Sequence, residues 1–231
     1  MKKRLLSLIM AVMMVVVLVV PAAAATTDTT SGGTVTVYVT YGMFQDEGIG
    51  TYPAYKGGLP TSDNIDANFY INAYTLSISS IETDYMATTQ GIYGVPDTSV
   101  SYFKTPNVLD AILATFFENG IDITDTNAVN AGWDSKPVAG NPGGYIHGVS
   151  PEYTTVKIQN GVVVDGVSYT VYTGNGWNIA CGTSASNIKA LDAYGTSVEL
   201  TDGMIIVFDY SPYVIYEDRK STLVKIGKAH V

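Results

Sequence analysis

The sequence predicts an α+β domain in which a mixed or antiparallel sheet packs against one main helix. Three observations support this fold class. Residues 34–41 alternate Thr or Tyr with Val over most of their length, the period-two pattern of a half-buried strand. Residues 106–119 carry a wide apolar face at helical spacing. The short apolar runs that follow are separated by Asn-Gly and Asp-Gly pairs, which favour hairpin turns, so strands outnumber helices.

The first residues have the pattern of a secretory signal. A basic head, an apolar run at 5–20 and four consecutive alanines follow one another. We predict a signal peptide over 1–25, a flexible Thr/Ser/Gly tether over 26–33 and a single domain over 34–231. The apolar run is shorter than the ~20 residues that usually cross a bilayer. We therefore expect a secreted protein, either released or associated with the cell envelope, that contacts a membrane only if this segment stays uncleaved.

Composition excludes several classes of function. The chain has 12 basic and 21 acidic residues; three of the basic residues lie in the signal, so the remainder carries a net charge of −12. A nucleic-acid partner is excluded because it requires a basic surface. A hydrophobic content of 46% is sufficient for a packed core. The single cysteine, Cys181, cannot form an internal disulfide, which in an exported protein indicates a Gram-positive or anaerobic source.

The region after the first strand has weaker patterns. Residues 42–68 are rich in Gly, Pro, Asp and Asn and are expected to be irregular. A strand is predicted over 69–81 and a short helix over 82–90.

The main helix is predicted over 106–119. Thr105 can cap its N-terminus, Pro106 suits the first turn and Gly120 supplies the end. Its apolar residues lie one turn apart in two rows, so we expect the helix to pack on a sheet.

The C-terminal half reads as a series of hairpins. Strands are expected at 145–149 and 154–159, and Asn160-Gly161 and Asp165-Gly166 are predicted as two-residue turns. A further strand is expected over 167–173.

A final pair of strands completes the predicted sheet. The first begins at Gly176-Trp177-Asn178, and the second lies within 194–210. We expect a tight turn at Asp202-Gly203.

This order of motifs resembles the transcobalamin C-terminal-like family, also called domain of unknown function 4430. The resemblance rests on the Leu109-Asp110-Ala111-Ile112 helix, the Gly176-Trp177 strand and the Leu200-Thr201-Asp202-Gly203 turn. It covers most of 34–213, with an insertion at about 43–103. It implies a β-grasp-like sheet around one helix, in an exported protein that binds a corrinoid such as cobalamin. The chain departs from the family pattern at 178–182 and at Met204, both near the expected ligand edge.

Four residues are candidate ligand contacts. Trp177 can stack on a planar ligand or fill the core between sheet and helix. Asn178 follows it where the chain leaves the family pattern. Trp133 lies in a Gly/Asn-rich loop, where an exposed aromatic residue suits binding, and Tyr145 lies on a short predicted strand.

Catalytic and metal sites are weakly supported. Cys181 and His147 are the only pair that could form a thiol hydrolase, and each has an ordinary structural explanation. Acidic stretches at 63–68 and 122–134 offer oxygen ligands for calcium, but they lack the spacing of a hand-type loop and suit turns better. We therefore predict no enzyme and no metal site.

The sequence as a whole favours an exported, non-enzymatic binding domain. Its ligand would be a corrinoid or another small molecule. The alternative is a cell-envelope module for protein interaction or adhesion, which would use exposed strand edges to bind a cell-surface protein.

Overall fold

The structure is a computed structural model that describes residues 32–49, 52–61, 63, 70–93, 105–133 and 144–218. The predicted signal peptide, most of the tether and most of the acidic stretch at 63–68 lie outside these residues. No helix in the described ranges is both long enough and apolar enough to span a bilayer.

The centre of the molecule is a parallel pair of strands from opposite ends of the described chain. Strand β1 (Thr34–Tyr41) has the predicted bounds and pairs in parallel with β11 (Met204–Asp218). On its other side β1 pairs antiparallel with β4 (Ile71–Ser77). Strand β11 pairs antiparallel with the long β9 (Val167–Gly182). The sheet is therefore mixed, as predicted.

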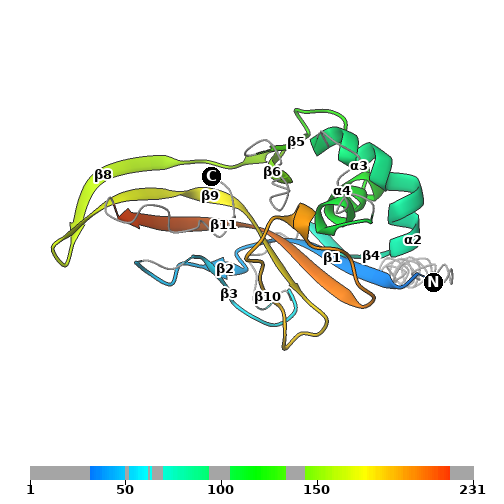
Figure 1. Cartoon of the computed structure of the whole chain (residues 1–231), viewed down its shortest axis with the longest axis horizontal. Helices are drawn as coiled ribbons and strands as arrows, with labels where there is room; N and C mark the ends of the chain where they lie inside the picture. The colour runs from blue at the N-terminus through cyan, green and yellow to red at the C-terminus, as the bar shows by residue number, and fades with distance from the viewer. Residues whose placement is uncertain are drawn as a thin grey trace, which may run out of the picture.

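Two shorter strands share the outer edge of β9. Strand β8 (Lys157–Val164) pairs with its first half, and β10 (Lys189–Ala190) pairs near its end. The result is a six-stranded sheet with the path β10-β9-β11-β1-β4 and β8 beside β9 (Figure 1). The fold is thus mixed α/β and mostly strand, with one main helix on a mixed six-stranded sheet.

The main helix, α4 (Val108–Glu118), begins two residues later than predicted because Asn107, not Thr105, is its cap. The Asn107 side-chain oxygen accepts hydrogen bonds from the N–H groups of Leu109 (2.9 Å) and Asp110 (3.2 Å). The Asp110 carboxylate accepts one from the Asn107 N–H at 3.0 Å. This reciprocal arrangement is a capping box, and it satisfies N–H groups that a helix start leaves without partners.

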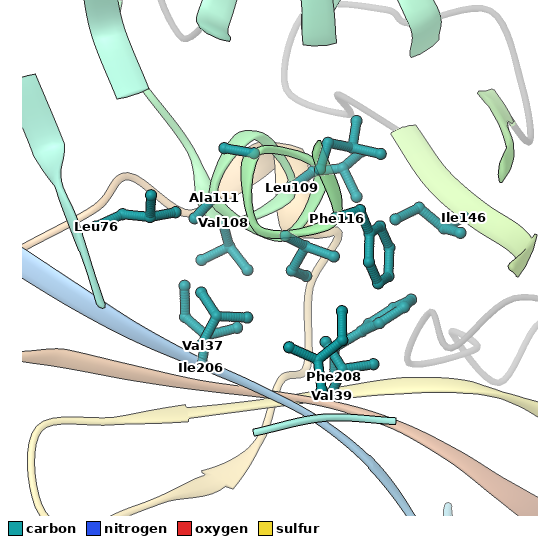
Figure 2. Packing of buried hydrophobic residues seen from close by; sticks show 14 of the residues in the cluster. Val37, Val39, Leu76, Val108, Leu109, Ala111, Phe116, Ile146, Ile206 and Phe208 are labelled. Atoms are coloured by element: carbon teal, nitrogen blue, oxygen red, sulfur yellow. The ribbon is translucent and has the colours of Figure 1, made fainter. Parts of the chain in front are cut away.

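Helix α4 packs on one face of the central strands. Val37 and Val39 on β1 and Ile206 and Phe208 on β11 point toward the helix and are buried (Figure 2). The rings of Phe116 on α4 and Phe208 meet edge to face, with centroids 6.0 Å apart. The wide apolar face of the helix thus covers a sheet, as its pattern predicts.

A second helical segment follows β4 and also contacts α4. It consists of α2 (Ile78–Ser80), the π-helical turn η1 (Ile81–Tyr85) and α3 (Met86–Tyr93). The predicted strand over 69–81 therefore ends early, at Ser77, whose hydroxyl caps α2. The Thr89 hydroxyl donates to the Asp110 carboxylate and joins α3 to α4.

The opposite face of the sheet is covered by a hairpin of β2 (Phe44–Gln45) and β3 (Ala54–Tyr55). Met43 and Phe44 pack there in a separate apolar cluster with Val207 on β11. The sheet therefore has an apolar layer on both faces near its centre.

A buried carboxylate fixes this hairpin to the sheet. Asp209 on β11 is fully buried. It accepts hydrogen bonds from the Thr40 hydroxyl at 2.7 Å, the Met43 N–H at 3.0 Å and the Ser211 hydroxyl. Burial raises the pKa of Asp209, and these donors act in the opposite direction because they favour the ionised form.

A separate three-stranded sheet lies beside α4. It contains β5 (Val129–Trp133), β6 (Gly144–Val149) and β7 (Glu152–Tyr153), all antiparallel. The predicted strand at 145–149 corresponds to β6. Its buried residues Ile146 and Val149 join the main core.

Away from the helices, the ends of β8, β9 and β11 continue as a three-stranded arm (Figure 1). Its tip is the predicted turn at Asp165-Gly166, where both residues have positive φ, 49° and 79°. The predicted turn at Asn160-Gly161 is wrong. These residues lie within β8, where the register shifts between Asn160 and Val162, so Gly161 forms a bulge.

The Asp202-Gly203 turn is present, but it does not join two strands. The backbone N–H of Met204 donates to the Thr201 carbonyl at 3.0 Å, and β11 begins immediately afterwards. Before the turn, the chain forms the short 3-10 helix η3 (Gly195–Ser197). The turn instead anchors β1, because the Asp202 carboxylate accepts from the Thr34 N–H at 2.9 Å.

Candidate functional site

A pocket of about 260 Å³ lies between β9, β6 and the segment that follows β10. Its floor and walls come from the centre of β9, from the start of β6 and from the loop at 190–195. The lining includes Phe44, Tyr52, Tyr145, Trp177, Leu191 and Tyr194. Apolar and aromatic side chains with few polar groups are the usual lining of a small-molecule site.

Trp177 contributes to both the pocket and the core. Its indole ring stacks on Phe208 with centroids 4.4 Å apart and ring planes 5° apart, and only 5% of the residue is exposed. Its indole N–H donates to the Glu152 carbonyl at 3.1 Å. The residue is therefore held rigidly, and it offers the pocket only a small part of its surface.

Two tyrosines fix the same turn of the small sheet. The Tyr70 hydroxyl donates to the Ser150 carbonyl at 3.0 Å, and the Tyr210 hydroxyl donates to the Tyr153 carbonyl at 2.7 Å. With Trp177, three aromatic side chains thus donate to carbonyls of the segment around β7. Each ring packs against the core and uses its polar end to hold the segment around β7 in place.

The Glu152 carboxylate lies among these aromatic groups. Within the described residues its Oε2 atom is buried and has no hydrogen-bond partner. Burial, and next the nearby Glu152 charge, raise the pKa of Tyr70 and Tyr210. Both phenols therefore remain protonated donors at neutral pH.

The other predicted contacts are placed as follows. Asn178 is 4% exposed, lines the pocket and donates from its amide to the Gly176 carbonyl at 3.2 Å. Tyr145 also lines the pocket, and its hydroxyl is hydrogen-bonded to His147. Trp133 ends β5 opposite Gly144, and its side chain lies outside the described residues. Three of the four candidates are thus brought together at one pocket.

Cys181 and His147 do not belong to this pocket. Cys181 lies near the end of β9 opposite Lys189, and burial raises the pKa of its thiol to about 12. A thiol with so high a pKa is protonated at neutral pH and is a poor nucleophile. His147 lies on β6, where its ring meets Tyr145. Neither residue is among those that line the pocket.

The acidic stretch at 122–127 forms local turns. Asp122 accepts from the N–H of Thr124 at 2.9 Å and from its hydroxyl at 2.7 Å, and these bonds lower the pKa of Asp122. Asp125 accepts from the Asn127 N–H at 2.9 Å in the same way. Among the described residues no group of three or more acidic, His or Cys side chains is placed to hold a metal ion.

No family model, curated protein or solved structure matches the chain.

Several pocket residues have no signal in the sequence. Leu191 and Tyr194 follow β10 in a segment without periodicity, and Phe44 and Tyr52 come from the region predicted to be irregular. They meet Trp177 only because β10 and the β2–β3 hairpin return to β9. The sequence indicates these pocket residues only by placing aromatic residues next to Gly or Pro, and that combination is typical of many loops.

Proposed function

We propose that this chain is an exported, non-enzymatic binding domain with a β-grasp-like fold, and that its ligand occupies the pocket beside β9. The observation that carries the proposal is the pocket itself, because three of the four residues singled out as ligand contacts line it. The rigid stack of Trp177 on Phe208 supports it further, since a preorganised wall lowers the ordering cost of binding.

The size of the pocket limits what it can enclose. Its volume of about 260 Å³ is slightly below the ~300–1,000 Å³ of sites that bury a drug-sized ligand. A small molecule fits inside. A corrinoid, the ligand that the family resemblance implies, is much larger and would be held by one edge or substituent at the mouth.

Ligand binding can be tested by thermal unfolding with cyanocobalamin. If the corrinoid binds, a concentration 100-fold above its Kd is expected to raise Tm by about 5–10 °C, because the ligand stabilises only the folded state. Ala193→Phe places a ring in the pocket lining and is expected to abolish the rise.

The matched control is Val163→Phe, which adds a similar ring on the arm, where the side chain is 67% exposed. It is expected to leave the rise in Tm unchanged. No rise with the wild-type chain rejects the corrinoid. A rise that survives Ala193→Phe rejects this pocket as its site.

The alternative is an interaction module of the cell envelope, and the arm is the observation that favours it. Among the described strands β8 pairs only with β9, which leaves its other edge open to them. Ile158 and Val163 are 55% and 67% exposed. They pair with Tyr172 and Ser168, four residues apart on β9, so both lie on one face. Exposed apolar residues next to an open strand edge are typical of interaction surfaces.

The two functions separate in a binding assay with isolated cell envelopes. If the arm is the interaction surface, the double variant Ile158→Lys with Val163→Lys is expected to lose envelope binding on the order of tenfold, since charge on an edge blocks strand pairing. Ala193→Phe is expected to bind as the wild type does. Equal binding by the double variant and the wild type contradicts the alternative.

A further inference from the structure

The outer edge of β9 has a gap between its two partners. On one side the Thr155 N–H donates to the Asn175 carbonyl at 2.9 Å, and on the other the Leu191 N–H donates to the Ile179 carbonyl at 2.8 Å. Alternate residues of a strand point their N–H and C=O groups toward the same neighbour. The N–H and C=O of Trp177, midway between Asn175 and Ile179, therefore point to the same outer edge.

Among the described residues, Trp177 has no backbone partner at this edge. Its opposite neighbour is Tyr210 on β11, whose C=O accepts from the Gly42 N–H at 3.2 Å and therefore faces β1, away from Trp177. The pairs on either side, Gly176 with Ser211 and Asn178 with Asp209, are then the bonded ones. Within the described part of the chain no hydrogen bond is formed by the backbone N–H or C=O of Trp177. A strand residue in a folded core rarely leaves both groups without a partner.

The gap coincides with the pocket. The lining contains Trp177 and its two successors on β9, together with residues 190–195, the segment that leaves β9 after β10. The remaining walls are mainly apolar. A ligand in this pocket therefore meets one donor and one acceptor, the N–H and C=O of Trp177, on an otherwise apolar surface. These two groups decide which polar group of a ligand the pocket can recognise.

We infer that the pocket recognises a primary or cis amide group, which completes the missing pairing of Trp177 with its own C=O and N–H. The inference rests on the proposed binding function and specifies its ligand class. In a primary amide or a cis amide an N–H and the C=O lie on the same side, as the N–H and C=O of one residue of a neighbouring strand do. A trans secondary amide points the two groups in opposite directions. The ligand is compact, because Thr155 and Leu191 bond to β9 at Asn175 and Ile179, each two residues or ~6.8 Å of rise from Trp177. A strand that runs through is excluded.

The geometry can be tested first without a ligand, by amide hydrogen exchange. The amide of Trp177 is expected to exchange on the order of tenfold or more faster than those of Gly176 and Asn178, which bond to β11. Equal protection of the three amides would overturn the inference, because Trp177 would then already have a partner.

Ligand class is tested with 2-pyrrolidinone, a cyclic amide held in the cis form, and with γ-butyrolactone, which has nearly the same shape but lacks the N–H donor. A fragment of this size binds with a Kd on the order of 10–100 mM. 2-Pyrrolidinone is expected to shift the Trp177 amide proton downfield and slow its exchange in NMR spectra. γ-Butyrolactone is expected to have no such effect, and Ala193→Phe is expected to abolish the response to 2-pyrrolidinone while Val163→Phe retains it.

The outcomes separate the inference from the function on which it rests. If both probes shift the pocket resonances equally, or 2-pyrrolidinone shifts them without affecting the Trp177 amide, the pocket binds but amide recognition is wrong. If 2-pyrrolidinone changes no resonance, the inference is also wrong. The binding function itself fails only if cyanocobalamin and both probes leave every pocket resonance unchanged.

Discussion

Asp209→Ala is expected to lower the free energy of unfolding by about 3–5 kcal/mol. The side chain is fully buried, and its loss would leave the Thr40 and Ser211 hydroxyls and the Met43 N–H without their acceptor. The hairpin on the second face of the sheet would lose its attachment at the same time. The measurement is urea unfolding followed by circular dichroism.

The matched control is Asp202→Ala at the start of the same strand region. Asp202 is exposed and accepts one hydrogen bond, from the Thr34 N–H, so its loss is expected to cost about 1 kcal/mol or less. A cost at Asp209 no larger than that at Asp202 would contradict the role assigned to the buried carboxylate.

The Asp209 carboxyl also gives the stability a pH dependence. Burial raises its pKa above the ordinary value of 3.8, so between these two values the folded chain binds more protons than the unfolded chain. The stability that this proton uptake contributes is therefore complete below the ordinary pKa, and it is lost as the pH rises through the raised pKa of Asp209. Asp209→Asn cannot ionise, and it is expected to remove this decline in urea unfolding measured from about pH 4 upward.

Phe208→Ala is expected to lower the free energy of unfolding by about 3–5 kcal/mol. The ring is 2% exposed and lies between Trp177, on which it stacks, and Phe116 on the main helix (Figure 2). Its removal leaves a cavity at the junction of the sheet, helix and pocket. The measurement is chemical unfolding, with tryptophan emission recorded in parallel because the stacked indole would lose its neighbour.

Ile215→Ala is the control for this change, because it removes an aliphatic side chain from the arm end of the same strand, where the residue is only half-buried. Its expected cost is about 1 kcal/mol. If Phe208→Ala were no more costly than Ile215→Ala, the aromatic stack would not contribute as the packing indicates.

Local patterns predicted the central elements well. The alternation at 34–41 located β1 without error, because one side of the strand packs under α4 and that burial requires a period of two. The apolar rows of the main helix were also sufficient to place it. Its first residue was missed because Thr105 and Asn107 are both good caps, and only Asn107 is followed by an acidic residue placed to complete the capping box.

Errors arose where two local signals competed. Asn160-Gly161 and Asp165-Gly166 are both favourable hairpin turns, and a strand between them would be only three residues long. The structure uses the second as the turn and absorbs the first as a bulge, which lets β8 pair over its whole length. Sequence patterns cannot decide such a choice, because it depends on how much ladder each register forms with β9.

The pocket could be predicted only in part. Trp177, Asn178 and Tyr145 were singled out, but their meeting depends on the order of strands, which local patterns do not specify. The gap beside Trp177 was harder still to predict, because it depends on which parts of β9 the strands β8 and β10 pair with.

The parallel pairing of β1 with β11 governs the order of folding. Thr40 and Asp209, which are hydrogen-bonded in the native state, are 169 positions apart along the chain. The helix has no complete surface to cover until the last strand arrives, so closure of this very long loop must precede burial of the core. Such nonlocal closure makes folding slow. A chain synthesised from the N-terminus is therefore expected to complete its core only when its final strand is available.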